Sequence, residues 1–122
     1  MIDHVTEISS TQLEAETQQR CYHGYRFVTA TCIDNGNETF DLFYHFDLDG
    51  QLDNLRLNVR KDENVPSISQ IYFCALLVEN EMKELFGVNI TDIVIDYGGH
   101  MLLAEGAPTT PMAGGQIIIE RR

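Results

Sequence analysis

The sequence predicts an α+β domain in which an antiparallel or mixed sheet of four to five strands packs against an N-terminal helix and one long amphipathic helix. Two observations predict this fold. Between residues 25 and 61, three stretches alternate apolar and polar residues with the period of two that is typical of strands. Between residues 66 and 87, apolar residues recur at spacings of three and four, the period of a helix. A chain of 122 residues is the size of one such domain.

The N-terminal helix is expected over residues 9–23. Two pairs have the spacing of a capping box, namely Ser9 with Gln12 and Thr11 with Glu14. Gly24 is suited to end the helix because glycine adopts the left-handed conformation without strain.

Three strands are expected to follow as an antiparallel meander, over residues 25–34, 39–47 and 51–61. Residues 34–37, with the sequence Asp-Asn-Gly-Asn, predict a hairpin turn because Asn and Gly tolerate positive φ angles. The third strand alternates regularly between apolar and polar residues, which indicates a sheet with one face exposed to water.

The long helix is expected to begin at Pro66 or Ser67, because Ser67 and Gln70 have capping-box spacing, and to end at Gly87. A short strand is expected over residues 88–96.

A return strand over residues 100–104 would complete a domain that spans residues 1–105. From residue 106 to residue 122 the chain is rich in glycine, proline and small polar residues. Such a segment buries little surface by itself, so we expect an extended C-terminal tail that a partner orders.

Composition restricts the possible partners. Nineteen acidic and eight basic residues give a formal charge of −11, which disfavours binding to nucleic acid or anionic lipid. Residues 62–120 contain nine acids and one base, Lys83, and should prefer a basic protein surface. No apolar run approaches the roughly 20 residues that span a bilayer. We therefore expect a cytoplasmic protein with reduced cysteines.

Motifs for metal binding or nucleophilic catalysis are weak. Asp47 to Gly50 resembles the start of a calcium loop, but the twelfth position is Asn58 instead of Glu, so a hairpin turn is favoured. Cys21 and His23 offer two ligands where structural zinc needs about four. The chain has no Gly-x-Ser-x-Gly motif. We expect no catalytic residue, metal or cofactor in this chain.

Three glutamates near the end of the long helix, Glu79, Glu81 and Glu84, are not explained by helix stability, because negative charge there opposes the helix dipole. Glu79 also lies on or beside the apolar stripe, so its carboxylate needs a partner. An internal arginine could supply it, and the candidates are Arg26, Arg56 and Arg60. A basic residue of another protein could supply it equally well.

Four segments in this order carry a resemblance to a known family: Phe43-Tyr44-His45-Phe46, Leu55-Arg56-Leu57-Asn58-Val59, Val65-Pro66-Ser67-Ile68, and Glu79-x-Glu81-x-x-Glu84-Leu85-Phe86-Gly87-Val88. The chain resembles the thirty-kilodalton subunit family of respiratory complex I, that is, of NADH-quinone oxidoreductase. That family includes the equivalent subunit of energy-converting, membrane-bound [NiFe] hydrogenases. Glu84 stands where complex I members have Asp and Asn80 where they have Arg, and the basic C-terminal stretch is missing. These departures favour the hydrogenase branch, such as the Ech type.

The resemblance implies a structural subunit without a redox cofactor of its own. Its implied partners are the large subunit of a hydrogenase or of complex I and the iron–sulfur small subunit, which would carry the Ni-Fe centre and the clusters. Membrane contact would be made only through partners, on the cytoplasmic face. The residues expected to bind partners are Glu79, Glu81, Glu84, Phe86, His45, Pro108 and Pro111.

Two other classes of function stay open. A stand-alone acidic module could bind and sequester a basic protein. A small hydrolase could use the carboxylates, but it would need two of them in a solvent-accessible cleft.

Overall fold

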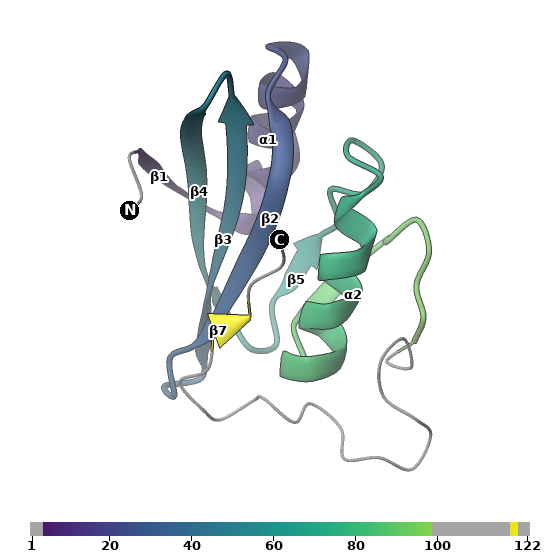
Figure 1. The fold of residues 1–122 in the computed structure, drawn as a ribbon. Coiled ribbons are helices and arrows are strands. Elements are labelled where there is room, and N and C mark those ends of the chain that lie inside the picture. The colour runs from purple at the N-terminus through teal and green to yellow at the C-terminus, as the bar shows by residue number, and fades with distance from the viewer. Residues whose placement is uncertain (1–3, 99–117, 120–122) are drawn as a thin grey trace.

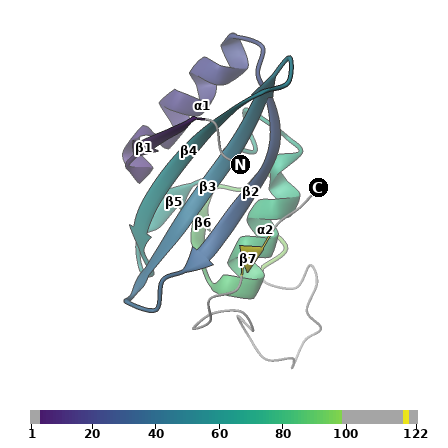
Figure 2. The ribbon, with the colours of Figure 1, turned by 60° about the vertical axis from the view of Figure 1, so that its left-hand side comes forward.

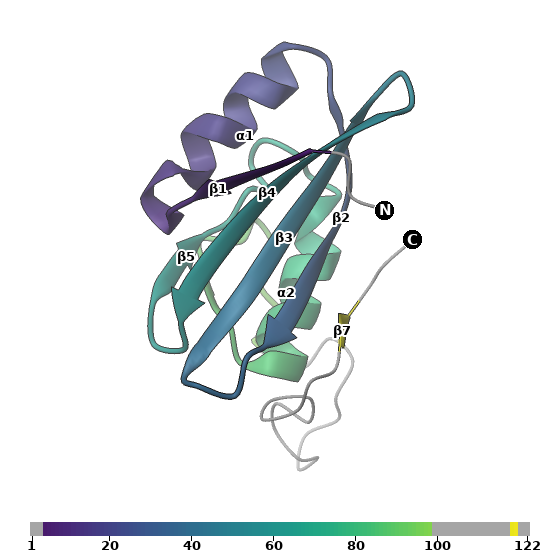
Figure 3. The same cartoon turned by 90° about the vertical axis from the view of Figure 1, so that its left-hand side faces the viewer.

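A computed structural model describes residues 4–98 and 118–119 of the chain. Its main sheet has the strand order β1-β4-β3-β2-β7, with both helices on one face (Figures 1 and 3). A second sheet of two short strands, β5 and β6, lies on the same side as the helices (Figure 2). The expected α+β fold with a mixed sheet and two helices is confirmed.

The N-terminal segment forms a strand before the first helix. β1 (Val5–Ile8) pairs in parallel with β4, and the sequence analysis did not predict it. A 3₁₀ turn, η1 (Ser10–Gln12), then leads into α1 (Leu13–Tyr22). Of the two predicted capping pairs, Ser9 and Gln12 form one, because the Gln12 side chain accepts a hydrogen bond from the Ser9 N–H at 2.9 Å. Gly24, at φ +87°, follows the helix end as expected.

The predicted meander is confirmed. β2 (Arg26–Asp34), β3 (Thr39–Leu48) and β4 (Gln51–Arg60) pair antiparallel, and Gly36 takes φ +75° in the first turn. Alternate side chains of β3 form the centre of the core and are at most 1% exposed: Phe40, Leu42, Tyr44 and Phe46. Asp49 and Gly50 form the turn between β3 and β4, and Asp47 and Leu48 end β3, so the hairpin interpretation of the Asp47 to Gly50 segment is correct.

The long helix begins later than expected. α2 (Ala75–Phe86) starts at Ala75, so the prediction of a start at Pro66 or Ser67 is wrong. The Ser67 hydroxyl accepts from the Ser69 N–H and donates to Glu79 on the helix itself, so residues 67–74 form turns. Gly87 ends α2 at φ +83°, as predicted.

The strand predicted over residues 88–96 is too long. β6 (Asn89–Thr91) pairs in parallel with the unpredicted β5 (Asn64–Pro66), and Asp92 leaves the strand conformation at φ +62°. The return strand at 100–104 lies outside the described residues. In the tail, β7 (Ile118–Ile119) pairs antiparallel with β2.

Tyr72 packs residues 67–74 onto the sheet. Its ring centroid lies 6.0 Å from that of Phe27 and 5.8 Å from that of Phe46, and its hydroxyl donates to the Tyr25 carbonyl at 2.6 Å. The turns before α2 are therefore part of the packed domain. Within the described part of the chain, no helix is long and apolar enough to cross a bilayer.

Tyr44 and Tyr72 make a matched pair for measuring the value of a buried hydroxyl. Among the described residues the Tyr44 hydroxyl has no hydrogen-bond partner, and burial raises the pKa of Tyr44. Tyr44→Phe is therefore expected to raise the free energy of unfolding by about 1 kcal/mol, because a desolvated, unpaired hydroxyl is removed. Tyr72→Phe should lower it by about 1 kcal/mol, because a hydrogen bond is lost. Chemical denaturation measures both, and destabilisation by Tyr44→Phe would contradict this account.

Candidate functional site

Glu79 is fully buried at the second turn of α2, and its carboxylate is satisfied inside this chain. The Ser67 hydroxyl donates to Oε1 at 2.6 Å, and the Ile68 N–H donates to Oε2 at 2.8 Å. These partners are internal, but they are a hydroxyl and an amide, so the expectation of an internal arginine is wrong. The three candidate arginines instead pair with other carboxylates: Arg26 with Asp47, Arg56 with Asp41 and Glu7, and Arg60 with Asp62.

The environment of Glu79 favours its protonated form. Burial raises the pKa of Glu79 from 4.5 to about 7, although the hydrogen bonds from Ser67 and Ile68 act in the opposite direction. Around neutral pH the carboxyl group is therefore a mixture of its charged and neutral forms.

The hydrogen bonds of Glu79 continue through two serines to the segment after β6. The Ser67 hydroxyl lies 2.7 Å from that of Ser69, and Ser69 Oγ accepts from the Val94 N–H at 2.9 Å. Both serines are buried. One carboxylate thus connects the turns before α2 with the chain that follows β6.

Asn80 and Lys83 hold that same segment further along the helix. The buried Asn80 amide donates to the Leu76 and Ile95 carbonyls, both at 2.8 Å, and its oxygen accepts from the Tyr97 N–H at 3.0 Å. Lys83 Nζ lies 2.5 Å from Asp96 Oδ2. The non-helical residues 95–97 are therefore fixed to α2 by side chains of the helix.

The other residues of α2 that were expected to bind partners are also buried. Glu81 is 5% exposed, Glu84 is 3% exposed, and Phe86 packs edge-on against Phe40 with ring centroids 6.3 Å apart. With Glu79 they lie in the interior of this chain, and these helix acids do not line an open cleft of the kind a hydrolase needs. Their role in docking stays a prediction.

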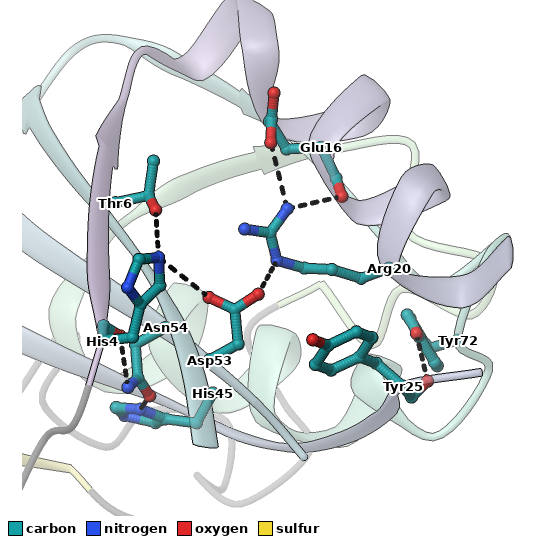
Figure 4. Close-up of polar contacts among 9 residues, drawn as sticks. All are labelled: His4, Thr6, Glu16, Arg20, Tyr25, His45, Asp53, Asn54 and Tyr72. Atoms are coloured by element: carbon teal, nitrogen blue, oxygen red, sulfur yellow. Dashed lines mark hydrogen bonds and ion pairs between the residues drawn. The ribbon is translucent and has the colours of Figure 1, made fainter. Parts of the chain in front are cut away.

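His45 lies apart from Glu79, on the opposite face of β3. Its ring pairs with the Thr31 hydroxyl at 3.0 Å and with Asn54 Oδ1 at 2.6 Å, and it stacks on the Phe43 ring at 6.3 Å between centroids. Asn54 Nδ2 in turn donates to the His4 carbonyl at 2.8 Å (Figure 4). His45 therefore helps to fix β1 to the sheet. The two expected proline contacts, Pro108 and Pro111, lie outside the described residues.

A second polar cluster, which the sequence analysis missed, joins α1 to the sheet (Figure 4). Arg20 Nε lies 3.0 Å from Asp53 Oδ2, and Arg20 Nη1 lies 3.0 Å from Glu16 Oε1. The guanidinium also stands over the Phe46 ring at 5.8 Å. The spacing of four residues between Glu16 and Arg20 was the available signal, but Asp53 is distant in sequence and could not be assigned.

Comparison with known proteins decides the family. Residues 6–112 match the family described as "Respiratory-chain NADH dehydrogenase, 30 Kd subunit". The chain belongs to this family. It is 33% identical over 79 residues to the C subunit of NADH-quinone oxidoreductase from Ruegeria pomeroyi, and the match covers 58% of this chain and 40% of the relative. The chain therefore spans less than half the length of that relative.

A solved structure supports the fold of this complex I-type subunit. A chain in the structure of the membrane-bound sulfane sulfur reductase, described as an archaeal respiratory membrane complex, superposes with a TM-score of 0.72. The match covers 88% of this chain and 66% of that chain, at 15% sequence identity. At 15% identity, this similarity shows that the two chains share a fold and nothing further.

Metal ligands do not cluster in this complex I-type subunit as far as it is described. Over residues 4–98, no group of three or more His, Cys, Asp or Glu side chains is placed to hold a metal ion. Cys32 is buried, and burial together with the nearby Asp34 and Asp41 raises the pKa of its thiol well above the usual range. Burial therefore favours the protonated form of this thiol.

The raised pKa of Glu79 predicts a pH-dependent stability. Between about pH 4.5 and pH 7 the folded chain binds a proton at Glu79 that the unfolded chain has released. The contribution of Glu79 to the free energy of unfolding should therefore be fully present below pH 4.5 and fall as the pH rises to 7, by about 3 kcal/mol in total. Glu79→Gln, which cannot titrate, should lack this fall.

Denaturant unfolding of both proteins at half-unit pH steps measures the effect. The difference between them isolates Glu79 from the other carboxyl groups, and Glu14→Gln, at an exposed position of α1, serves as the matched control. Parallel stability curves for the wild type and Glu79→Gln would contradict a raised pKa.

Proposed function

We propose that this chain is a non-catalytic structural and assembly subunit of a membrane-associated respiratory complex. It docks on the large, catalytic-type subunit and holds it beside the iron–sulfur subunit, so that the distances for electron transfer between their cofactors are maintained. The family match over residues 6–112 carries this proposal. The environment of Glu79 supports it, because this carboxylate is buried and its hydrogen bonds hold segments of this chain together.

The complex is an energy-converting [NiFe] hydrogenase or a complex-I-like oxidoreductase, in which electron transfer is coupled to ion translocation. The Ni-Fe centre and the iron–sulfur clusters belong to the partner subunits in this proposal. The chain lies on the cytoplasmic face and reaches the membrane through its partners. The sequence departures at Asn80 and Glu84 favour the hydrogenase, and the superposition on a chain of an archaeal respiratory membrane complex is consistent with this branch.

A stand-alone acidic binding module is the second candidate, favoured by the formal charge of −11. It would bind a basic protein through its surface without membership of a membrane complex. The two candidates differ in the fraction of the cell in which the protein is found and in what elutes with it.

Purification of the tagged chain from its native membranes tests the proposal. We expect the large subunit and the iron–sulfur subunit to elute with it in roughly equal amounts, with nickel in the eluate if the complex is a hydrogenase. Iron without nickel would instead indicate the complex I type. Elution of the chain alone from the soluble fraction would contradict the proposal and favour the binding module. An unrelated acidic protein with the same tag controls for non-specific retention.

A further inference from the structure

Five exposed apolar side chains lie on the turn before α2, on α2 itself and on the segment after β6 that is hydrogen-bonded to α2. We name this surface the α2 flank, and its members, with their exposed fractions, are Phe73 (61%), Leu77 (49%), Val94 (45%), Ile95 (43%) and Tyr97 (44%). The segment after β6 runs beside α2 on the side away from the sheet (Figure 1). Contiguous exposed apolar surface of this kind marks interaction sites in soluble proteins.

Hydrogen bonds bring the two halves of the α2 flank together. Phe73 lies in the turn just before α2, where its carbonyl accepts a hydrogen bond from the Leu76 N–H at 3.1 Å, and Leu77 follows in the first turn of the helix. Asn80, one turn beyond Leu77, binds the backbone of Ile95 and Tyr97. Leu77 therefore lies next to the segment that carries the other three side chains.

The α2 flank is held by buried polar groups. Glu79 fixes Ser67 and Ile68 at the start of the turns that carry Phe73, and Ser69 fixes Val94. A segment without helix or strand structure would ordinarily lose conformational entropy on binding a partner. Because the Val94 backbone is already bonded to Ser69, and the backbones of Ile95 and Tyr97 to Asn80 of α2, docking onto this surface has a smaller entropic cost.

Charge indicates the chemistry of the partner. Between residues 73 and 98 the exposed charged side chains are Asp92 and Asp96, and the half-buried Lys83 is already paired with Asp96. These side chains leave one net negative charge beside the α2 flank, that of Asp92. It disfavours an anionic membrane surface and a second copy of the same flank, and it suits a protein segment that carries Lys or Arg beside apolar side chains.

We propose that the α2 flank is the surface through which this chain docks onto the large subunit, and that it receives an apolar segment of that subunit flanked by basic residues. This inference rests on the proposed function and names the docking surface within it. Phe73 and Tyr97 are the expected anchors, because buried aromatic side chains dominate the energetics of protein interfaces. Glu79, Ser69 and Asn80 are positioning residues for this surface.

The double variant Phe73→Ser/Leu77→Gln tests the proposal in the tagged chain expressed in its native host. Both side chains are exposed, so the midpoint of thermal unfolding should stay close to that of the wild type. The amount of the large subunit that is retrieved per tagged chain should fall at least about tenfold. Tyr22→Ser removes an aromatic side chain that is 84% exposed at the end of α1, and it should leave this amount unchanged.

Cys74 provides a second measurement that does not depend on a variant. It is exposed beside Phe73, whereas Cys21 on α1 is half-buried. In the native complex, alkylation of Cys74 by N-ethylmaleimide, followed by mass spectrometry, should be at least about tenfold slower than in the free chain, because a docked partner excludes the reagent. Alkylation of Cys21 should proceed at the same rate in both.

The negative charge beside the α2 flank has its own test. Asp92→Asn removes one charge while keeping a residue that tolerates the φ of +62° at this position. Association with the large subunit should weaken about twofold to fivefold at low salt, and the difference should vanish at about 1 M salt. An unchanged affinity at low salt would overturn the basic character of the partner segment.

The remaining outcomes separate the inference from the proposed function. If the wild-type chain retrieves no large subunit, the proposed function fails and the inference fails with it. If the wild type retrieves the large subunit and the Phe73→Ser/Leu77→Gln variant does so equally, or Cys74 is alkylated equally fast in the complex, only the inference is overturned. Sedimentation of the free chain with phosphatidylcholine–phosphatidylglycerol vesicles, or dimerisation through the α2 flank, would also overturn it.

Discussion

The burial of one carboxylate constrains the helical side of this molecule. Glu79 is fully buried, and a charged or polar group in such a place must be hydrogen-bonded. The chain meets this need by turning back so that Ser67 and Ile68 donate to the carboxylate. In this arrangement residues 67–74 lie before the helix, and α2 begins at Ala75.

The next residue of the helix, Asn80, forms hydrogen bonds to the chain after β6. This chain has Asn80 after Glu79, at the position where the resemblance led us to expect arginine. The Asn80 side chain donates two hydrogen bonds and accepts one from the Tyr97 N–H. An arginine has no acceptor for that N–H. The departure from the expected arginine is therefore tied to how residues 95–97 lie against α2.

Sequence reasoning predicted the features that depend on neighbours in the chain. The meander over residues 25–61 and the helix ends at Gly24 and Gly87 follow from local periodicity and from glycine. β1 could not be predicted, because its short run pairs in parallel with β4, which is distant in the sequence, and carries no periodic signal of its own. For Glu79 the sequence showed that a partner was needed, but not that Ser67 would supply it, because the same serine had the spacing of a helix cap.

Amide hydrogen exchange in Glu79→Ala tests most directly whether this carboxylate organises the surface proposed for docking. The account predicts that exchange protection falls at Ile68, where the acceptor is lost, and at Val94, where the serine connection is weakened. The amides of β3, such as that of Leu42, should keep their protection relative to the wild type under the same conditions. Unchanged protection at Ile68 and Val94, or a uniform loss that includes β3, would contradict the central role given to Glu79.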